Sequence, residues 1–80
     1  MKLPRSLSAN ELIKALKNYQ YEVERQKGSH IRLITTLNGE HHITIPNHDP
    51  LRIGTLSSIL SEVANHLSKT KEQVIEELFG

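Results

Sequence analysis

The fold of this 80-residue chain is decided by residues 30–45, which read HIRLITTLNGEHHITI. Two runs rich in branched aliphatic residues flank Asn38-Gly39, and this dipeptide between such runs is a strong hairpin signal. We therefore expect two antiparallel strands, over about 30–36 and 40–45. Their register has to be settled separately, because a shift of one residue exchanges the two faces of a strand.

Two loop lengths are compatible with this hairpin. A two-residue loop would separate Leu33 from Ile34 and Ile43. A three-residue loop over 37–39, with Gly39 in the left-handed conformation, gathers four aliphatic side chains on one face: Ile31, Leu33, Ile43 and Ile45. We prefer this register because it buries all four together. The opposite, open face then carries His30, Arg32, Ile34, His42 and Thr44.

Helical patterns precede and follow the hairpin. A capping box that starts at Ser8 opens a helix over about 9–18, and a second box opens a short helix over about 70–79. Between them, apolar residues recur at helical spacing and predict an amphipathic helix over about 54–66. His66 lies at the end of that helix, and we expect it to face solvent.

Residues 21–25 alternate between apolar and polar side chains, which predicts a strand with Tyr21 and Val23 facing inward. The element order is therefore α-β-β-β-α plus a terminal helix. This order predicts an α+β fold, a three-stranded antiparallel sheet with helices packed on one face. This arrangement resembles a double-stranded-RNA-binding domain (dsRBD) in topology. No linker or repeat divides the sequence, so we expect one domain over 1–80 with its core at 8–67.

Composition restricts the class of protein. The formal net charge of +1 is too small to indicate nucleic-acid binding by itself. The chain has no Trp and one Phe, which argues against an aromatic platform for stacking bases. It has no Cys, which excludes disulfides and Cys-based zinc sites. No apolar run approaches the roughly 18 residues of a membrane span, and the N-terminus lacks a signal-peptide core. We expect a cytoplasmic protein that does not contact membranes.

The strongest candidates for a functional site are residues 25–30, which read RQKGSH. Gly28 permits a positive φ and lets a ligand approach the backbone closely. The Ser29 hydroxyl and nearby backbone N–H groups can hold a phosphate oxygen, and the ordinary pKa of His30 suits proton transfer near neutral pH. Positive charge comes from Arg25, Lys27 and Arg32. The pattern is compatible with a phosphodiester site. The alternative is that the cations only prevent an edge strand from pairing with the strand of another molecule.

Three motifs, in this order, resemble the HicA toxin family. They are RQKGSH at 25–30, ITIP at 43–46 followed by His48, and GTL with a later IL at 54–60. The resemblance covers roughly residues 8–67. It implies a dsRBD-like fold and a small mRNA interferase that a HicB-like antitoxin holds inactive. It also implies that His30 is the catalytic residue.

On this interpretation the protein cleaves RNA without a metal or another cofactor. The RNA itself supplies the nucleophile, a 2′-OH beside the scissile phosphate. His30 would act as general base on that hydroxyl or as general acid on the leaving 5′-oxygen. The cations Arg25, Lys27 and Arg32 would neutralise the phosphate, which Gly28 and Ser29 would position. The sequence does not identify a second acid–base group.

The remaining histidines of this region invite a metal-site interpretation: His41, His42 and His48. Adjacent residues of a strand point to opposite faces, and few carboxylates are close, so we expect no metal site. We expect His42 and His48 to contact RNA on the open face instead. Direct DNA binding is not expected, because no helix shows a basic, base-reading face. The alternative function is a non-catalytic module that binds RNA or protein through the basic face around residues 25–32.

Overall fold

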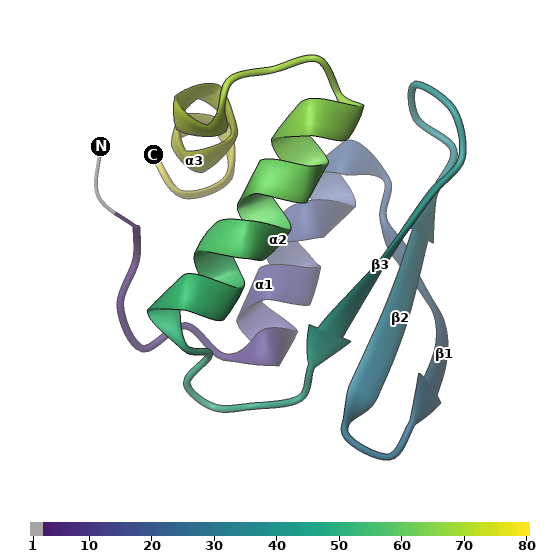
Figure 1. Ribbon diagram of the computed structural model, residues 1–80, viewed down its shortest axis with the longest axis vertical. Helices are drawn as coiled ribbons and strands as arrows, with labels where there is room; N and C mark the ends of the chain where they lie inside the picture. The colour runs from purple at the N-terminus through teal and green to yellow at the C-terminus, as the bar shows by residue number, and fades with distance from the viewer. Residues whose placement is uncertain (1–2) are drawn as a thin grey trace.

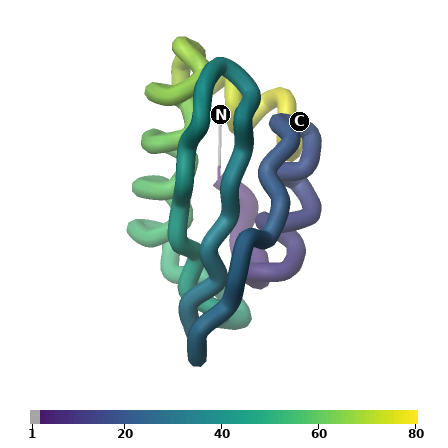
Figure 2. The backbone as a smooth tube through the Cα atoms, turned by 90° about the vertical axis from the view of Figure 1, so that its right-hand side faces the viewer, coloured from purple at the N-terminus to yellow at the C-terminus, as the bar shows by residue number. Residues whose placement is uncertain are grey.

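Helices and strands form two layers in the computed structural model, which describes residues 3–80 (Figure 1). Along the chain the elements are α1 (Ala9–Leu16), the 3-10 helix η1 (Lys17–Tyr19), β1 (Glu22–Lys27), β2 (His30–Thr35), β3 (His41–Pro46), α2 (Ile53–His66) and α3 (Lys71–Phe79). The strands pair antiparallel in the order β1-β2-β3. Seen after a 90° turn, the strands lie in front and the helices behind them (Figure 2). The predicted α+β, dsRBD-like layout is confirmed.

The pairing of β2 with β3 has the predicted register. Ile31 lies opposite Ile45, and Leu33 lies opposite Ile43. The last pair before the turn is Thr35 with His41, so residues 36–40 connect the two strands, and Gly39 has a positive φ of +97°. All four aliphatic side chains are buried, none of them more than 4% exposed. The sheet therefore presents one continuous apolar face to the helical layer.

Capping boxes begin two of the three α-helices. At α1 the Ser8 hydroxyl accepts a hydrogen bond from the Glu11 N–H, and the Glu11 carboxylate accepts one from the Ser8 N–H. Thr70 and Gln73 form the same arrangement at α3. The apolar stripes of the helices then complete the core. Its helical members include Leu12, Leu16, Leu56, Leu60, Val63 and Val74, each at most 1% exposed.

The strand β1 differs from the prediction in its bounds and in its burial. It runs from residue 22 to 27, and all six of its residues are exposed. Tyr21, just before it, is buried as predicted. Val23 lies on the helix-facing side of the sheet, opposite Leu33, but it is 51% exposed and does not enter the core. β1 is an edge strand of the sheet, and the chain is buried at Tyr21 but exposed from Glu22 onwards. A favourable alternation pattern cannot bury a residue that lies beyond the covering layer.

The end of α2 is joined to the loop of the β2–β3 hairpin through His66. Its Nε2 lies 2.8 Å from the Leu37 carbonyl oxygen and 3.0 Å from that of Gly39. The Asn38 side-chain amide donates to the His66 carbonyl over 2.8 Å. The His66 ring also stacks on His41, with 4.4 Å between ring centroids. The prediction that His66 faces solvent is therefore wrong, because the tertiary fold brings the hairpin loop against the helix end.

A buried threonine joins the end of β2 to the segment that follows α1. Thr35 is 2% exposed, and its Oγ1 donates to the Tyr19 carbonyl oxygen at 2.8 Å. The same oxygen accepts a hydrogen bond from the Leu37 N–H at 3.1 Å. One hydroxyl thus satisfies two backbone groups from different parts of the chain.

Substitution Thr35→Val should lower the free energy of unfolding by about 1–3 kcal/mol. Valine has nearly the same shape, but it leaves the Tyr19 carbonyl and the Leu37 N–H without their partner. The measurement is urea unfolding followed by circular dichroism. Thr36→Val is the matched control, because Thr36 is exposed. Equal stability of the two variants would contradict this role of Thr35.

Acidification should destabilise the fold through His41. Burial, followed by the neighbouring His66, lowers the pKa of His41 below the ordinary value of 6.5. The unfolded chain therefore binds a proton at a higher pH than the folded chain does. The stabilising contribution of neutral His41 is fully present above about pH 6.5 and is lost as the pH falls through the lowered pKa.

This pH dependence can be measured as the free energy of unfolding between about pH 5 and pH 7.5. His41→Gln should show a shallower loss of stability on the acidic side than the native chain, whatever its absolute stability. The comparison variant is His48→Gln, because His48 is an exposed loop residue. An unchanged slope in His41→Gln would refute the assignment.

Candidate functional site

A β-bulge in β1 determines which of its side chains reach the open face of the sheet. Val23 pairs with Leu33, and the next pair along the strands is Arg25 with Arg32, so Glu24 is an extra residue. Directly opposed residues of antiparallel strands place their side chains on the same face. Val23 therefore shares the helix-facing side with Leu33, whereas Arg25 shares the open side with Arg32.

The bulge brings two cations to the face that carries His30. After the register shift, Lys27 lies directly opposite His30. In a strand that simply continued the alternation from Val23, Arg25 and Lys27 would both point towards the helices. One inserted residue thus places them on the solvent-exposed side. Strand alternation in the sequence does not reveal this inversion.

The open face contains a hollow of about 560 Å³ at the β1–β2 turn. Its lining residues are Arg25, Lys27, Gly28, Ser29, His30, Arg32 and Thr44. The structure therefore brings together the predicted catalytic residue and five of the predicted RNA-binding residues. Thr44 was not among the predicted site residues. It lies opposite Arg32 on β3, and the predicted register had already placed it on the open face.

The turn that forms the floor of this hollow depends on Gly28. Its φ is +59°, and a Cβ added there would meet nothing within 4 Å. Glycine is therefore required by the backbone conformation and not by a lack of space. The Ser29 carbonyl accepts a hydrogen bond from the Asn47 N–H at 2.6 Å, which ties the turn to the loop after β3. The loop after β3 therefore restrains the β1–β2 turn.

Two predicted RNA contacts lie outside the hollow. The ring of His42 is between two carboxylates, with Nδ1 at 3.2 Å from Glu24 and Nε2 at 2.8 Å from Glu40. His48 is exposed in the loop after β3, and its carbonyl accepts a hydrogen bond from the Ala9 N–H at 3.1 Å. Neither imidazole joins His30, so the hollow contains one histidine.

The charge of the open face is mixed. The Arg32 Nε donates to the Glu24 carboxylate at 3.0 Å, and Glu24 also approaches His42. Acidic residues thus lie at one end of the face and the cations Arg25 and Lys27 at the other, beside His30. No sequence pattern predicts the Glu24 contacts, because they depend on the bulge.

The histidines are not arranged as a metal site. Among residues 3–80, no three or more His, Cys, Asp or Glu side chains are placed to hold a metal ion. His41 packs against His66 under the hairpin, whereas His42 contacts carboxylates on the open face. The same described residues contain no helix that is long and apolar enough to cross a membrane.

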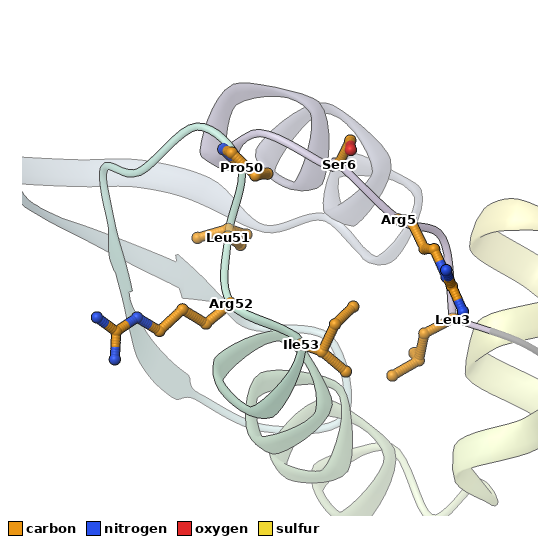
Figure 3. A pocket seen from close by; sticks show the side chains of 7 residues that line it. All are labelled: Leu3, Arg5, Ser6, Pro50, Leu51, Arg52 and Ile53. Carbon is orange, nitrogen blue, oxygen red and sulfur yellow. The ribbon is translucent and has the colours of Figure 1, made fainter.

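A second hollow, of about 710 Å³, lies between the N-terminal segment and the start of α2 (Figure 3). Ile53, which is 49% exposed, and Leu3 point into it, whereas Arg52 points away. The complete lining is Leu3, Arg5, Ser6, Pro50, Leu51, Arg52 and Ile53. None of these side chains exchanges a proton near neutral pH. General acid–base chemistry is therefore better supported at the His30 hollow.

Comparison with known proteins agrees with the resemblance in the sequence. The model of a family described as HicA toxin of bacterial toxin-antitoxin matches residues 9–64, which is more than half of the chain. The matched range contains the His30 hollow and all three strands. No curated protein and no solved structure matches the chain. The family match covers enough of the sequence to assign it: this chain belongs to the HicA toxin family of bacterial toxin–antitoxin systems.

Proposed function

We propose that this HicA-family toxin is a metal-independent endoribonuclease that cleaves mRNA with His30, and that a HicB-like antitoxin inhibits it. The observation that carries the proposal is the hollow itself, where one imidazole lies among three cations and a glycine turn. Membership of a toxin–antitoxin family supplies the expectation of an antitoxin. The site residues proposed are the seven that line the hollow, with His42 and His48 as outlying RNA contacts.

The reaction is transfer of the scissile phosphodiester to the adjacent 2′-oxygen. A bond forms between the 2′-oxygen and phosphorus, and the bond from phosphorus to the 5′-oxygen breaks. His30 removes the proton from the 2′-OH or donates one to the leaving 5′-oxygen. The products are a 2′,3′-cyclic phosphate and a 5′-hydroxyl. Both product ends can be identified chemically, so the proposed reaction can be tested by mapping them.

The three cations have different proposed roles in this reaction. Lys27 is directly opposite His30 and lines the same hollow, so its ammonium can stabilise negative charge that develops on the phosphoryl oxygens. Arg25 and Arg32 face each other across β1 and β2 and can hold the flanking phosphates. Thr44 contributes a hydroxyl to the rim of the hollow. Gly28 and Ser29 allow the backbone to approach the phosphate.

Exposure of the site supports inhibition by an antitoxin that binds over it. His30, Arg25 and Lys27 are all exposed on a face that carries no helix (Figure 2). An antitoxin that covers this face with acidic groups would exclude RNA and neutralise the cations together. HicB-like inhibition by direct covering of His30 requires no change in the fold of the toxin.

Substitution His30→Ala should lower the rate of RNA cleavage by at least about 100-fold, the usual contribution of a general acid or base. His30 is exposed, so the melting temperature should stay close to that of the native chain. The assay follows cleavage of a labelled RNA in the presence of EDTA and maps the product ends.

A retained cleavage rate in His30→Ala would refute its catalytic role. If the native chain binds RNA but does not cleave it, the protein is a non-catalytic binding module. In that case Arg25, Lys27 and Arg32 should contribute more to function than His30 does.

Substitution Lys27→Ala should weaken RNA binding by a similar factor for all RNA sequences, because a phosphate contact carries no base information. The slope of log affinity against log salt should fall by about 0.7, the value for one phosphate contact on a single strand. Fluorescence anisotropy at several salt concentrations measures both quantities. Lys14→Ala is the matched control, since Lys14 is an exposed cation on α1, in the layer behind the sheet. Equal slopes for the two variants would exclude a phosphate contact at Lys27.

A further inference from the structure

A chain of four polar side chains crosses the open face and ends at the hollow. Glu40 contacts His42 Nε2, and Glu24 contacts His42 Nδ1. The same Glu24 oxygen, Oε1, accepts the hydrogen bond from Arg32 Nε. Arg32 lines the hollow, whereas Glu24, Glu40 and His42 do not. The chain therefore connects the hairpin end of the sheet to one of the proposed phosphate-binding groups.

The contact between Glu24 and Arg32 uses only one part of the guanidinium. Arg32 donates to Glu24 from Nε, and among residues 3–80 no other side chain forms an ion pair with it. A guanidinium has five N–H donors in a rigid fork, and four of them are on the terminal nitrogens. Holding Nε fixes the plane of the fork and leaves the terminal nitrogens for a ligand in the hollow.

His42 holds the other side of this carboxylate. Both of its ring nitrogens lie within hydrogen-bonding distance of carboxylate oxygens. An imidazole can donate from both nitrogens only when it is protonated. His42 Nδ1 and Arg32 Nε both approach the same Glu24 oxygen, Oε1. Glu24 is thus restrained from two sides.

Stability does not explain this arrangement. The side chains of Arg32 and Glu24 are 39% and 36% exposed, and ion pairs that solvent reaches to this extent contribute little to folding. A carboxylate beside a phosphate-binding hollow should also repel RNA. The bulge nevertheless inserts Glu24 at this position, next to Arg25. An orienting role accounts for a negative group that neither stabilises the fold nor attracts the substrate.

We infer that Glu24 is a positioning residue, which fixes the Arg32 guanidinium so that its terminal nitrogens meet the scissile phosphate or its neighbour. This inference rests on the proposed function of the hollow. Glu24 does not touch the substrate and takes no part in proton transfer. Its effect on the reaction passes through Arg32.

Three substitutions separate orientation from charge. Glu24→Ala removes both the charge and the acceptor, whereas Glu24→Gln removes the charge and keeps an oxygen that can accept from Arg32 Nε. Glu22→Ala is the matched control. Glu22 lies opposite Ile34 on the open face and does not contact Arg32, so its substitution removes the same charge without affecting that contact. Kinetic constants for cleavage of a short RNA are measured for each variant and for the native chain.

If Glu24 positions Arg32, Glu24→Ala should lower kcat about tenfold without raising KM, because charge repulsion is relieved while orientation is lost. Glu24→Gln should retain most of kcat, and Glu22→Ala should keep kcat and lower KM slightly. In an Arg32→Ala background, Glu24→Ala should cause no further loss. Equal kcat values for Glu24→Ala and Glu22→Ala would overturn the inference, and so would additive losses with Arg32→Ala.

A second measurement does not depend on cleavage. The Arg32 Nε–H proton should exchange slowly with water in NMR spectra of the native chain and of Glu22→Ala, and quickly in Glu24→Ala. Equal exchange in all three proteins would overturn the inference even if the chain is a nuclease. Failure of the proposed function is recognised differently, as an absence of cleavage by the native chain or an unchanged rate in His30→Ala.

Discussion

The pairing of β2 with β3 is the interaction on which the rest of this structure depends. It places Leu33 opposite Ile43 and Ile31 opposite Ile45, so all four side chains enter one core. Burial of such side chains is the main favourable term in folding a chain of this size. The same register turns the alternate residues outwards. The face that the helices leave uncovered is therefore a direct consequence of how the core is filled (Figure 2).

The second constraint is the bulge at Glu24, which acts only on β1. Side chains of β2 and β3 alternate between the two faces without interruption, so His30 and Arg32 reach the open face by simple periodicity. β1 reaches it with Arg25 and Lys27 only because one residue is skipped in the pairing. An edge strand tolerates such an insertion because just one of its sides is paired. The cost to the core is small, since Val23 is already half exposed.

The local environment separates the histidines of this chain into different roles. His30 is exposed in the hollow, and His42 is held between carboxylates. His41 and His66 stack at the end of α2, where their contacts join the helix to the hairpin loop. Spacing along the chain does not distinguish these environments. An inference from histidine content alone would have combined residues that the fold places on opposite sides of the sheet.

The element order, the register of the hairpin and the family can be predicted from the sequence, because hydrophobic periodicity, the Asn38-Gly39 turn signal and short motifs are local signals. The sequence also indicated that residues 25–32 share one site. Only the tertiary structure decided that Val23 is exposed, that His66 contacts the hairpin loop, and that Glu24 holds Arg32. The outcomes for Val23 and Glu24 depend on the position of β1 in the sheet and on where its pairing shifts, and the outcome for His66 depends on how the hairpin packs against α2. All three are contacts between residues distant in the sequence, which no local pattern records.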